Sequence, residues 1–194
     1  CAGMALDVTR EEDVDRVFAE ATRRFGHLDI LVNSAGMNVR HLIEDFPLGE
    51  YRSILDVNLT GTWLCCRAAA RLMKPRRYGS VVNLGSALSK VALPERTAYC
   101  ASKFGVLGIT QALALEWAES GVRCNALLPG PFLTEMNKPL LADPEKARFV
   151  VGQTALNRWG ELKEIVGAAL YLASPASTYT TGAALSVDGG WTAR

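Results

Sequence analysis

LDILVN, residues 28–33, decides the fold class of this chain. The run is almost continuously apolar, which is the pattern of a parallel β-strand covered on both faces. An antiparallel strand with one face in water would instead alternate apolar and polar residues. Gly26 stands before the run, where it ends a helical pattern, and NSAG at 33–36 follows the run as a turn. A buried strand in a parallel sheet is therefore expected here.

Helical patterns alternate with further strand patterns along the rest of the chain. Thr9 and Glu12 have capping-box spacing and open the first helix, whose apolar residues recur at helical intervals. The expected helices cover 9–25, 47–74, 98–120 and 161–173. The other expected strands cover 3–8, 79–86, 122–128 and 184–190. Such alternation predicts a doubly wound parallel α/β sheet, Rossmann-like, in a single domain over 1–194.

Composition limits the kinds of partner. Lys and Arg number 21 against 20 Asp and Glu, and a net charge of +1 gives no field for nucleic acid or an acidic membrane. No apolar run approaches the length of a membrane span. The five cysteines form no CxxC pair, as expected of free thiols in a reducing cytoplasm. Only His27 and His41 offer imidazoles, and their spacing predicts no metal site.

Ligands of parallel sheets bind at the carboxyl ends of the strands, so the residues that follow each strand are candidates for a site. Asp7 either accepts a hydrogen bond from a ligand amino group or helps to start the next helix. Ala35 and Gly36 leave the backbone open to close approach. Ser86 has no GxSxG motif or nearby histidine to make it a nucleophile, which leaves it as a hydrogen-bond partner.

TAYCASKFG, residues 97–105, places Tyr99 and Lys103 four positions apart on one face of a helix. The two side chains are either an ordinary surface pair or a tuned proton donor. A free phenol titrates near ~10, and a neighbouring ammonium lowers its pKa by favouring phenolate. If Ser86 holds a substrate oxygen beside the phenol, proton transfer becomes possible, and the hydride transfer that must accompany it requires a cofactor.

Asn58, within LDVNLTG at 55–61, interrupts the helical pattern around it. Asparagine is a weak helix former, and Gly61 weakens the same helix three residues later. Such interruptions mark either functional positions or close packing. Both interpretations stay open for Asn58 from these residues alone.

Six short motifs follow one another along the chain: NSAG, LDVNLTG, NLGS, YCASK, LLPGPFLT and VDGGW. In this order, with Ser86 thirteen residues before Tyr99, they resemble the short-chain dehydrogenase/reductase family over essentially all 194 residues. The resemblance implies an oxidoreductase that interconverts a secondary alcohol and a ketone by hydride transfer with NAD or NADP. It also implies a homo-oligomer, a dimer or tetramer, assembled through the helices at 48–74 and 98–120.

The resemblance implies a role for each matching residue. Tyr99 is the proton donor or acceptor, and Lys103 lowers the pKa of Tyr99 and holds the nicotinamide ribose. Ser86 orients the substrate oxygen, and Asn58 maintains a water relay to Lys103. The implied cofactor-binding residues are, in chain order, Asp7, Val8, Asn33, Ala35, Gly36, Tyr99, Lys103, Pro129, Gly130, Phe132 and Thr134. The first two match the adenine-contacting pair of the family, and the last four match the segment beside the nicotinamide.

The resemblance fails at the start of the chain. The family begins with a strand and a TGxxxGxG turn whose backbone amides meet the cofactor pyrophosphate at a helix N-terminus, and this sequence contains no such pattern. The chain opens CAGMALDVT, without an initiator Met and directly in a strand pattern. We therefore expect an N-terminally incomplete dehydrogenase domain.

Within the family, NSAGMNVR, TEMNKPLLADPEK and VDGGWTA are most similar to sugar-acid enzymes of the gluconate 5-dehydrogenase type. On this interpretation Arg40 binds a substrate carboxylate; otherwise it is a solvated loop residue. Reductases of 3-oxoacyl thioesters share nearly all of these motifs and stay an alternative. A non-catalytic α/β binding module that has lost its nucleotide loop is another, and the intact Ser86, Tyr99 and Lys103 count against it.

Overall fold

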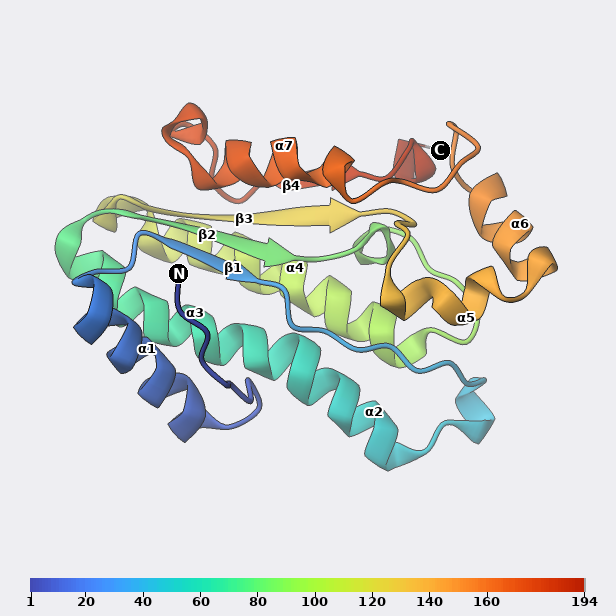
Figure 1. Ribbon diagram of the computed structural model, residues 1–194, viewed down its shortest axis with the longest axis horizontal. Helices are drawn as coiled ribbons and strands as arrows, with labels where there is room; N and C mark the ends of the chain where they lie inside the picture. The colour runs from blue at the N-terminus through green and yellow to red at the C-terminus, as the bar shows by residue number, and fades with distance from the viewer. Residues whose placement is uncertain (194) are drawn as a thin grey trace.

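A parallel four-stranded sheet forms the centre of the computed structural model, which describes residues 1–193. The strands are β1 (Ile30–Asn33), β2 (Gly79–Leu84), β3 (Val122–Pro129) and β4 (Ala184–Val187), and they lie in the order β1-β2-β3-β4. Figure 1 shows the strand arrows directed to one end of the molecule. The predicted parallel α/β fold is confirmed; the expected domain boundary at Arg194 lies outside the described residues.

Helices cover the sheet from both sides (Figure 1). One side carries α1 (Glu11–Phe25), α2 (Leu48–Leu55), α3 (Gly61–Met73) and α4 (Thr97–Trp117), and the other carries α7 (Lys163–Ala173). Beyond the carboxyl ends of the strands lie α5 (Lys138–Leu141) and α6 (Pro144–Gly152). Short turns complete the fold: η1 (Ile43–Asp45), η2 (Asp56–Thr60), η3 (Lys74–Arg76), η4 (Ala87–Ser89), η5 (Ala118–Ser120), η6 (Glu135–Asn137), η7 (Pro175–Ser177) and η8 (Trp191–Ala193).

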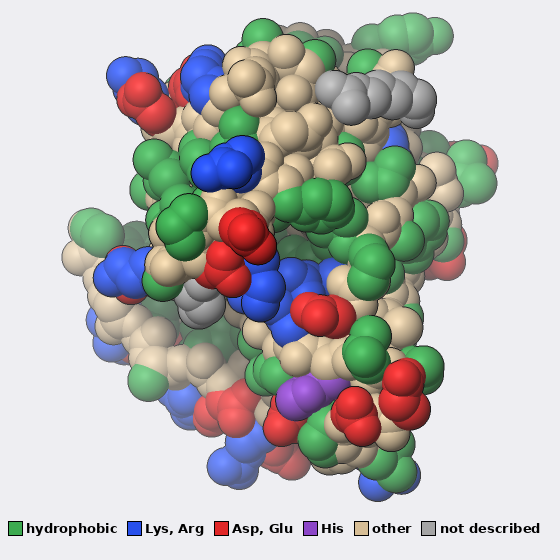
Figure 2. Space-filling view, turned by 90° about the vertical axis from the view of Figure 1, so that its right-hand side faces the viewer, with side chains coloured by type: hydrophobic (Ala, Val, Ile, Leu, Met, Phe, Trp, Pro, Cys, Tyr) green, Lys and Arg blue, Asp and Glu red, His purple; other side chains and the backbone are tan. Residues whose placement is uncertain are grey.

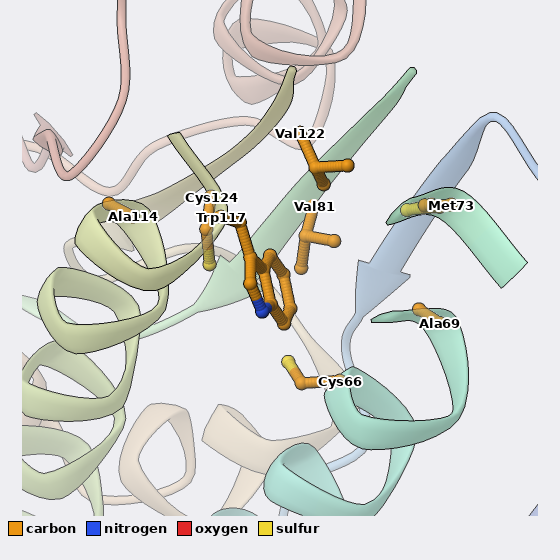
Figure 3. Packing of buried hydrophobic residues seen from close by; sticks show 8 residues of the cluster. All are labelled: Cys66, Ala69, Met73, Val81, Ala114, Trp117, Val122 and Cys124. Carbon is orange, nitrogen blue, oxygen red and sulfur yellow. The ribbon is translucent and has the colours of Figure 1, made fainter. Parts of the chain in front are cut away.

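Trp117 holds α4 against α3 and the sheet. Figure 3 shows its indole pointing toward Cys66 of α3, beside Val81 of β2 and Cys124 of β3. Only 3% of Trp117 is exposed, and burial of an indole is among the largest apolar contributions that one side chain makes, at about 25 cal/mol per Å². The two strands whose ends lead into the site are therefore fixed relative to α4.

The first residues do not form the strand expected at 3–8. A strand exists only through backbone hydrogen bonds to a neighbour, and the sheet that the structure describes pairs β1 with β2 and offers this segment none. The expected capping box is also wrong. Helix α1 begins at Glu11 with Arg10 as its N-cap, while the Asp7 carboxylate accepts hydrogen bonds from the Thr9 N–H and hydroxyl at 2.9 and 2.7 Å.

Three apolar side chains, two in β1 and one in α3, are about half exposed. In β1, Ile30 is 46% and Val32 is 49% exposed, because β1 is an edge strand of the described sheet and α7 covers the other strands instead. Trp63 is 44% exposed on α3, where the Arg67 guanidinium carbon lies 4.9 Å from its ring centroid. Leu64 and Ile54, by contrast, are buried.

The long helix expected at 47–74 is interrupted where Asn58 and Gly61 weaken it. A π-helical turn, η2, separates α2 from α3, and π-turns of this kind often occur at functional sites. A Cβ at Gly61 would lie 2.7 Å from Val8 Cγ2, so this glycine permits close contact with the first segment of the chain. The sequence irregularity at 58–61 thus has both a backbone and a packing cause.

The stretch Thr97–Ser120 corrects one expectation from composition. With 24 residues and a mean hydropathy of 1.2, it is long and apolar enough to cross a membrane by length and composition alone. Helices in the core of globular proteins meet the same criterion. Helix α4 packs on β3, and buried polar side chains such as Ser102 and Thr110 lie on its inner face. The inner face of this stretch is therefore part of the core beside the sheet, while other apolar residues of it, such as Leu115, are exposed.

Gly121 supplies the test of the fold. It ends η5 with φ of 66°, and a Cβ there would lie 2.6 Å from the Arg77 carbonyl oxygen. Gly121→Ala is therefore expected to lower the free energy of unfolding by about 1–3 kcal/mol in urea titrations. Gly49→Ala is the control, since a Cβ in α2 meets nothing within 4 Å and alanine favours a helix. Equal stability of Gly121→Ala and the wild type would contradict this account.

Candidate active site

A cavity of about 300 Å³ opens at the carboxyl end of the sheet, where parallel α/β folds bind ligands. Figure 2 looks onto this end of the molecule and shows a hollow with basic side chains at its edge and acidic ones close by. Its wall includes residues from after β1, β2 and β3 and from the first turns of α4. Among them are Arg40, Ser86, Tyr99, Lys103 and Gly130.

Ser86 begins the turn after β2 and is held by reciprocal hydrogen bonds. Its Oγ accepts from the Leu88 N–H at 3.1 Å, and its own N–H donates to Ser89 Oγ at 3.1 Å. Ser89 Oγ donates in turn to the Lys103 carbonyl oxygen at 2.8 Å. Because Ser89 is buried, this chain of bonds fixes the Ser86 turn against α4.

Lys103 is buried beneath Tyr99 on the inner face of α4. Its Nζ lies 5.7 Å from the centroid of the Tyr99 ring and donates a hydrogen bond of 2.7 Å to the Leu84 carbonyl oxygen at the end of β2. Only 5% of Lys103 is exposed, which excludes the ordinary surface pair. Burial lowers the pKa of the ammonium to about 8, so it is mostly charged at neutral pH.

The pKa of Tyr99 differs from the expected direction. Burial raises it above the usual value, and the neighbouring Ser86 hydroxyl offsets only part of this effect. The expected lowering by Lys103 is not seen, because desolvation of the phenol is the largest effect on its pKa. At neutral pH the phenol is therefore protonated, as a proton donor to a ketone oxygen must be.

Asn58 fastens the segment after β1 to α4. Its Oδ1 accepts from the Met37 N–H at 2.8 Å, and its Nδ2 donates to the Met37 carbonyl at 2.9 Å and to Ser102 Oγ at 3.0 Å. Ser102 Oγ donates to the Tyr99 carbonyl oxygen at 2.7 Å, so the bonds lead directly to the turn that carries the phenol. The water relay from Asn58 to Lys103 stays a prediction.

The structure brings some of the expected cofactor residues together and separates others. Gly36, Tyr99, Lys103, Pro129, Gly130, Phe132 and Thr134 line the cavity. Within residues 1–193, the cavity wall does not include Asp7, Val8, Asn33 or Ala35. The side chain of Asn33 instead turns into the sheet, where its Nδ2 donates to Asn83 Oδ1 at 2.8 Å. The Asp7 carboxylate is occupied by Thr9.

The residues around Gly36 fit the nicotinamide and ribose half of NAD(P). A Cβ at Gly36 would lie 3.5 Å from Asn58 Oδ1 and 3.9 Å from Lys103 Nζ, so glycine leaves open a gap that ends in polar atoms. Lys103 offers ammonium donors to ribose hydroxyl oxygens, and the backbone of 129–132 forms the opposite wall. These groups suit a polar ring and a sugar.

Two polar residues of the cavity, Asn38 and Arg96, were not predicted from the sequence. Asn38 Oδ1 is buried without a hydrogen-bond partner among the described residues, as is Nε of the predicted Arg40. Arg96 is 7% exposed and also lines the cavity. Arg96 precedes Tyr99 by three residues, and that proximity was the one available signal, whereas nothing in the sequence distinguishes Asn38.

Known proteins resemble the chain over nearly its whole length. The family model described as Enoyl-(Acyl carrier protein) reductase matches residues 1–192. Gluconate 5-dehydrogenase of Gluconobacter oxydans (strain 621H) is 38% identical over 187 residues, 96% of this chain and 73% of that protein. The 3-oxoacyl-(acyl-carrier-protein) reductase FabG of Vibrio cholerae serotype O1 is 37% identical over 188 residues, 97% of this chain and 76% of that protein.

A solved structure gives the same picture. The gluconate 5-dehydrogenase from Burkholderia cenocepacia J2315, in complex with NADP and tartrate, matches with a TM-score of 0.95 at 36% identity. The match covers 97% of this chain and 74% of that one. The chain thus spans about three quarters of the length of these proteins.

The buried ammonium generates a prediction for stability against pH. The pKa of Lys103 is about 8 in the fold and 10.5 when the side chain is exposed in the unfolded chain. Between these pH values the unfolded chain binds more protons, so this group makes stability rise with pH there. At pH 7 the buried charge costs on the order of 3 kcal/mol, offset partly by its bond to Leu84. Lys103→Met is therefore expected to be more stable than the wild type at pH 7.

Urea titrations of both proteins from pH 7 to 10 check this expectation. The stability advantage of Lys103→Met should shrink as the pH rises above 8, and the comparison cancels the titration of the buried cysteines, which both proteins share. If the difference in the free energy of unfolding between the two proteins does not depend on pH, Lys103 does not carry a buried charge as assigned.

Proposed function

The chain belongs to the short-chain dehydrogenase/reductase family of NAD(P)-dependent oxidoreductases, and we propose that it interconverts the secondary alcohol and the ketone of a sugar acid. One observation carries the choice of substrate: the cavity that holds Ser86 and Tyr99 also holds Arg40, whose buried Nε has no partner among the described residues. A carboxylate supplies that partner, because guanidinium binds carboxylates through two parallel hydrogen bonds.

Tyr99 exchanges the proton with the reacting oxygen of the substrate. Its raised pKa keeps the phenol protonated at neutral pH, ready to donate to a developing alkoxide, and the reverse reaction returns the proton. Ser86 holds the same oxygen, since its turn is fixed by Leu88 and Ser89. The charged Lys103 stabilises negative charge as it develops nearby.

Residues of this chain would hold the nicotinamide half of the cofactor in the same cavity. Lys103 would bind the ribose hydroxyls, and Gly36 would let the ribose approach the backbone. Pro129, Gly130, Phe132 and Thr134 would hold the nicotinamide. When bound, NAD(P) supplies or accepts the hydride. The family resemblance assigns Asp7 and Val8 to the adenine end and Asn33 and Ala35 to the adenosine ribose, although none of these four residues lines the cavity within the described part of the chain.

Asn38 extends the site for a polyhydroxylated substrate. Its buried Oδ1 lines the cavity without a partner among the described residues, and an alcohol hydroxyl can donate to it. A 3-oxoacyl thioester, the substrate named for one relative, carries neither a carboxylate near its ketone nor neighbouring hydroxyls. Arg40 and Asn38 therefore favour the sugar acid, and the cluster of Ser86, Tyr99 and the buried Lys103 favours an enzyme over a binding module.

We also propose a homo-oligomer in the cytoplasm, assembled through α3 and α4. Trp63 of α3 is 44% exposed beside Leu59, Gly105 and Ile109, which together form an apolar surface suited to a second copy. Trp117, by contrast, is buried within the chain. All five cysteines are free, and burial raises the pKa of Cys65 to about 11, which suits a reducing compartment.

Tyr99→Phe tests the assigned proton transfer. Loss of the hydroxyl is expected to lower kcat/KM for the alcohol by about 10² to 10⁴, measured from NAD(P)H absorbance. Cofactor affinity and thermal unfolding should stay close to those of the wild type. Tyr179→Phe is the control, because Tyr179 is fully exposed. Retained turnover in Tyr99→Phe would remove the assigned role.

Arg40→Gln tests the choice of substrate. We expect the KM for D-gluconate to rise about 10- to 100-fold, the usual weight of a hydrogen bond between charged groups. D-Sorbitol has the same skeleton with a hydroxymethyl group in place of the carboxylate, so its kcat/KM should change by less than about two-fold. An equal loss on both substrates would show that Arg40 does not recognise the carboxylate.

A further inference from the structure

The cavity carries more positive charge than the proposed reaction uses. Its described lining residues include three cations, Arg40, Arg96 and Lys103, and no Asp or Glu. Lys103 has the Leu84 carbonyl as a partner and a role beside the ribose. In the proposed function, Arg40 binds the carboxylate of the substrate. Arg96 is the cation that the proposed function leaves without a task.

Arg96 is buried with weak compensation for its charge. Its side chain is 9% exposed, and Nη1 donates a hydrogen bond of 3.3 Å to the Glu95 backbone carbonyl. The nearest carboxylate oxygen, Glu95 Oε2, lies 3.8 Å from Nη1, too far for a hydrogen bond. Burial and, to a smaller extent, the charge of Arg40 lower the pKa of Arg96 to about 10, so the guanidinium is still charged at neutral pH.

The backbone around Arg96 is costly in two additional ways. Glu95 adopts a left-handed conformation with φ of 62°, which is unfavourable for a residue with a side chain. Arg96 is then the N-cap of α4, the 21-residue helix of Tyr99, where the positive end of the helix dipole disfavours a cation. Within residues 1–193, no side chain caps this end of α4.

A single bound ligand would reduce these three unfavourable energies. An anion in the cavity would pair with Arg96, share the attraction of Arg40 and face the uncapped N-terminus of α4. Costs of this kind persist at functional sites, where the surrounding structure maintains a geometry that the ligand later uses. A merely structural arginine would be fully paired in the fold.

We propose that Arg96 is a second carboxylate-binding residue of the substrate site and that, with Arg40, it selects hydroxy acids over neutral polyols of the same skeleton. The inference rests on the proposed function for the identity of the substrate. Glu95 Oε2, 3.8 Å from Arg96 Nη1, offsets only part of the guanidinium charge, so positive charge remains for an anionic ligand.

Ligand binding in the absence of turnover tests the proposal. Calorimetry on Tyr99→Phe protein with bound NADP gives the Kd of D-gluconate and of D-sorbitol, and the same titrations are made with Arg96→Gln added. The Kd of D-gluconate is expected to rise about 10- to 100-fold, while that of D-sorbitol changes by less than about two-fold. Arg52→Gln, which removes an exposed charge from α2, should change neither.

Two results would overturn the proposal. One is an unchanged Kd for D-gluconate in Arg96→Gln. The other is an equal rise in the Kd of D-gluconate and of D-sorbitol, which a purely structural role of Arg96 would produce. If Arg96→Gln does not fold, Arg96→Lys decides: it keeps the charge but loses the planar fork, so we expect a rise of about 3- to 10-fold for D-gluconate alone. An unchanged Kd in Arg96→Lys would then overturn the proposal.

The failure of this proposal is distinguishable from failure of the proposed function. If the wild type oxidises D-gluconate and Arg96→Gln binds it normally, the reaction stands and Arg96 has no part in recognition. If the wild type oxidises no sugar acid but still binds D-gluconate in a manner that requires Arg96, the anion site stands and the proposed reaction fails.

Discussion

The hydrogen bond from Lys103 Nζ to the Leu84 carbonyl oxygen holds the site together. It joins the first turns of α4 to the carboxyl end of β2 over 2.7 Å, in a place where the ammonium is almost fully buried. A buried ammonium needs partners for its donors, and this bond supplies one of them at the point where α4 meets the end of β2. Tyr99 lies on the same helix as Lys103, and Ser86 lies in the turn that follows Leu84. The bond between Lys103 and Leu84 therefore helps to place both side chains.

Two further sets of hydrogen bonds join α4 to the segments that follow the strands. Ser89 bonds both the Ser86 N–H and the Lys103 carbonyl, and Asn58 bonds both Met37 and Ser102. Each of these side chains joins a strand-end segment to α4 through buried hydrogen bonds. Loss of either partner would leave an unpaired polar group in the interior. The phenol is therefore placed by a network rather than by its own contacts.

The site has two ends with different chemistry. Tyr99 and Ser86 form the end where a proton moves, and Arg40 and Arg96 form an end rich in positive charge. Desolvation governs both, since it raises the pKa of the phenol and lowers those of the two guanidiniums. An anionic substrate enters a cavity whose field favours it, and its reacting oxygen reaches the phenol while the charged group is held elsewhere.

The sequence predicted the parts of this arrangement that depend on period and order. The strand in the apolar run at 28–33, the helix expected at 98–120 and the interruption at Asn58 all appear in the structure, because parallel strands and helices leave regular patterns in the sequence. The strand expected at 3–8 failed, since pairing depends on a neighbour that local sequence does not reveal. The roles of Ser89 and Asn38 could not be predicted either, because the sequence pattern of a serine or asparagine in a turn is the same whether or not the side chain is buried.

The central claim is that the phenol and the guanidiniums bind opposite ends of one substrate. A crystal structure of the protein with NADP and D-gluconate tests it most directly. The account predicts an alcohol oxygen of the ligand within about 3 Å of both Tyr99 Oη and Ser86 Oγ, and the carboxylate within about 3 Å of Arg40. A ligand whose carboxylate faces solvent, or lies against Tyr99, would contradict it.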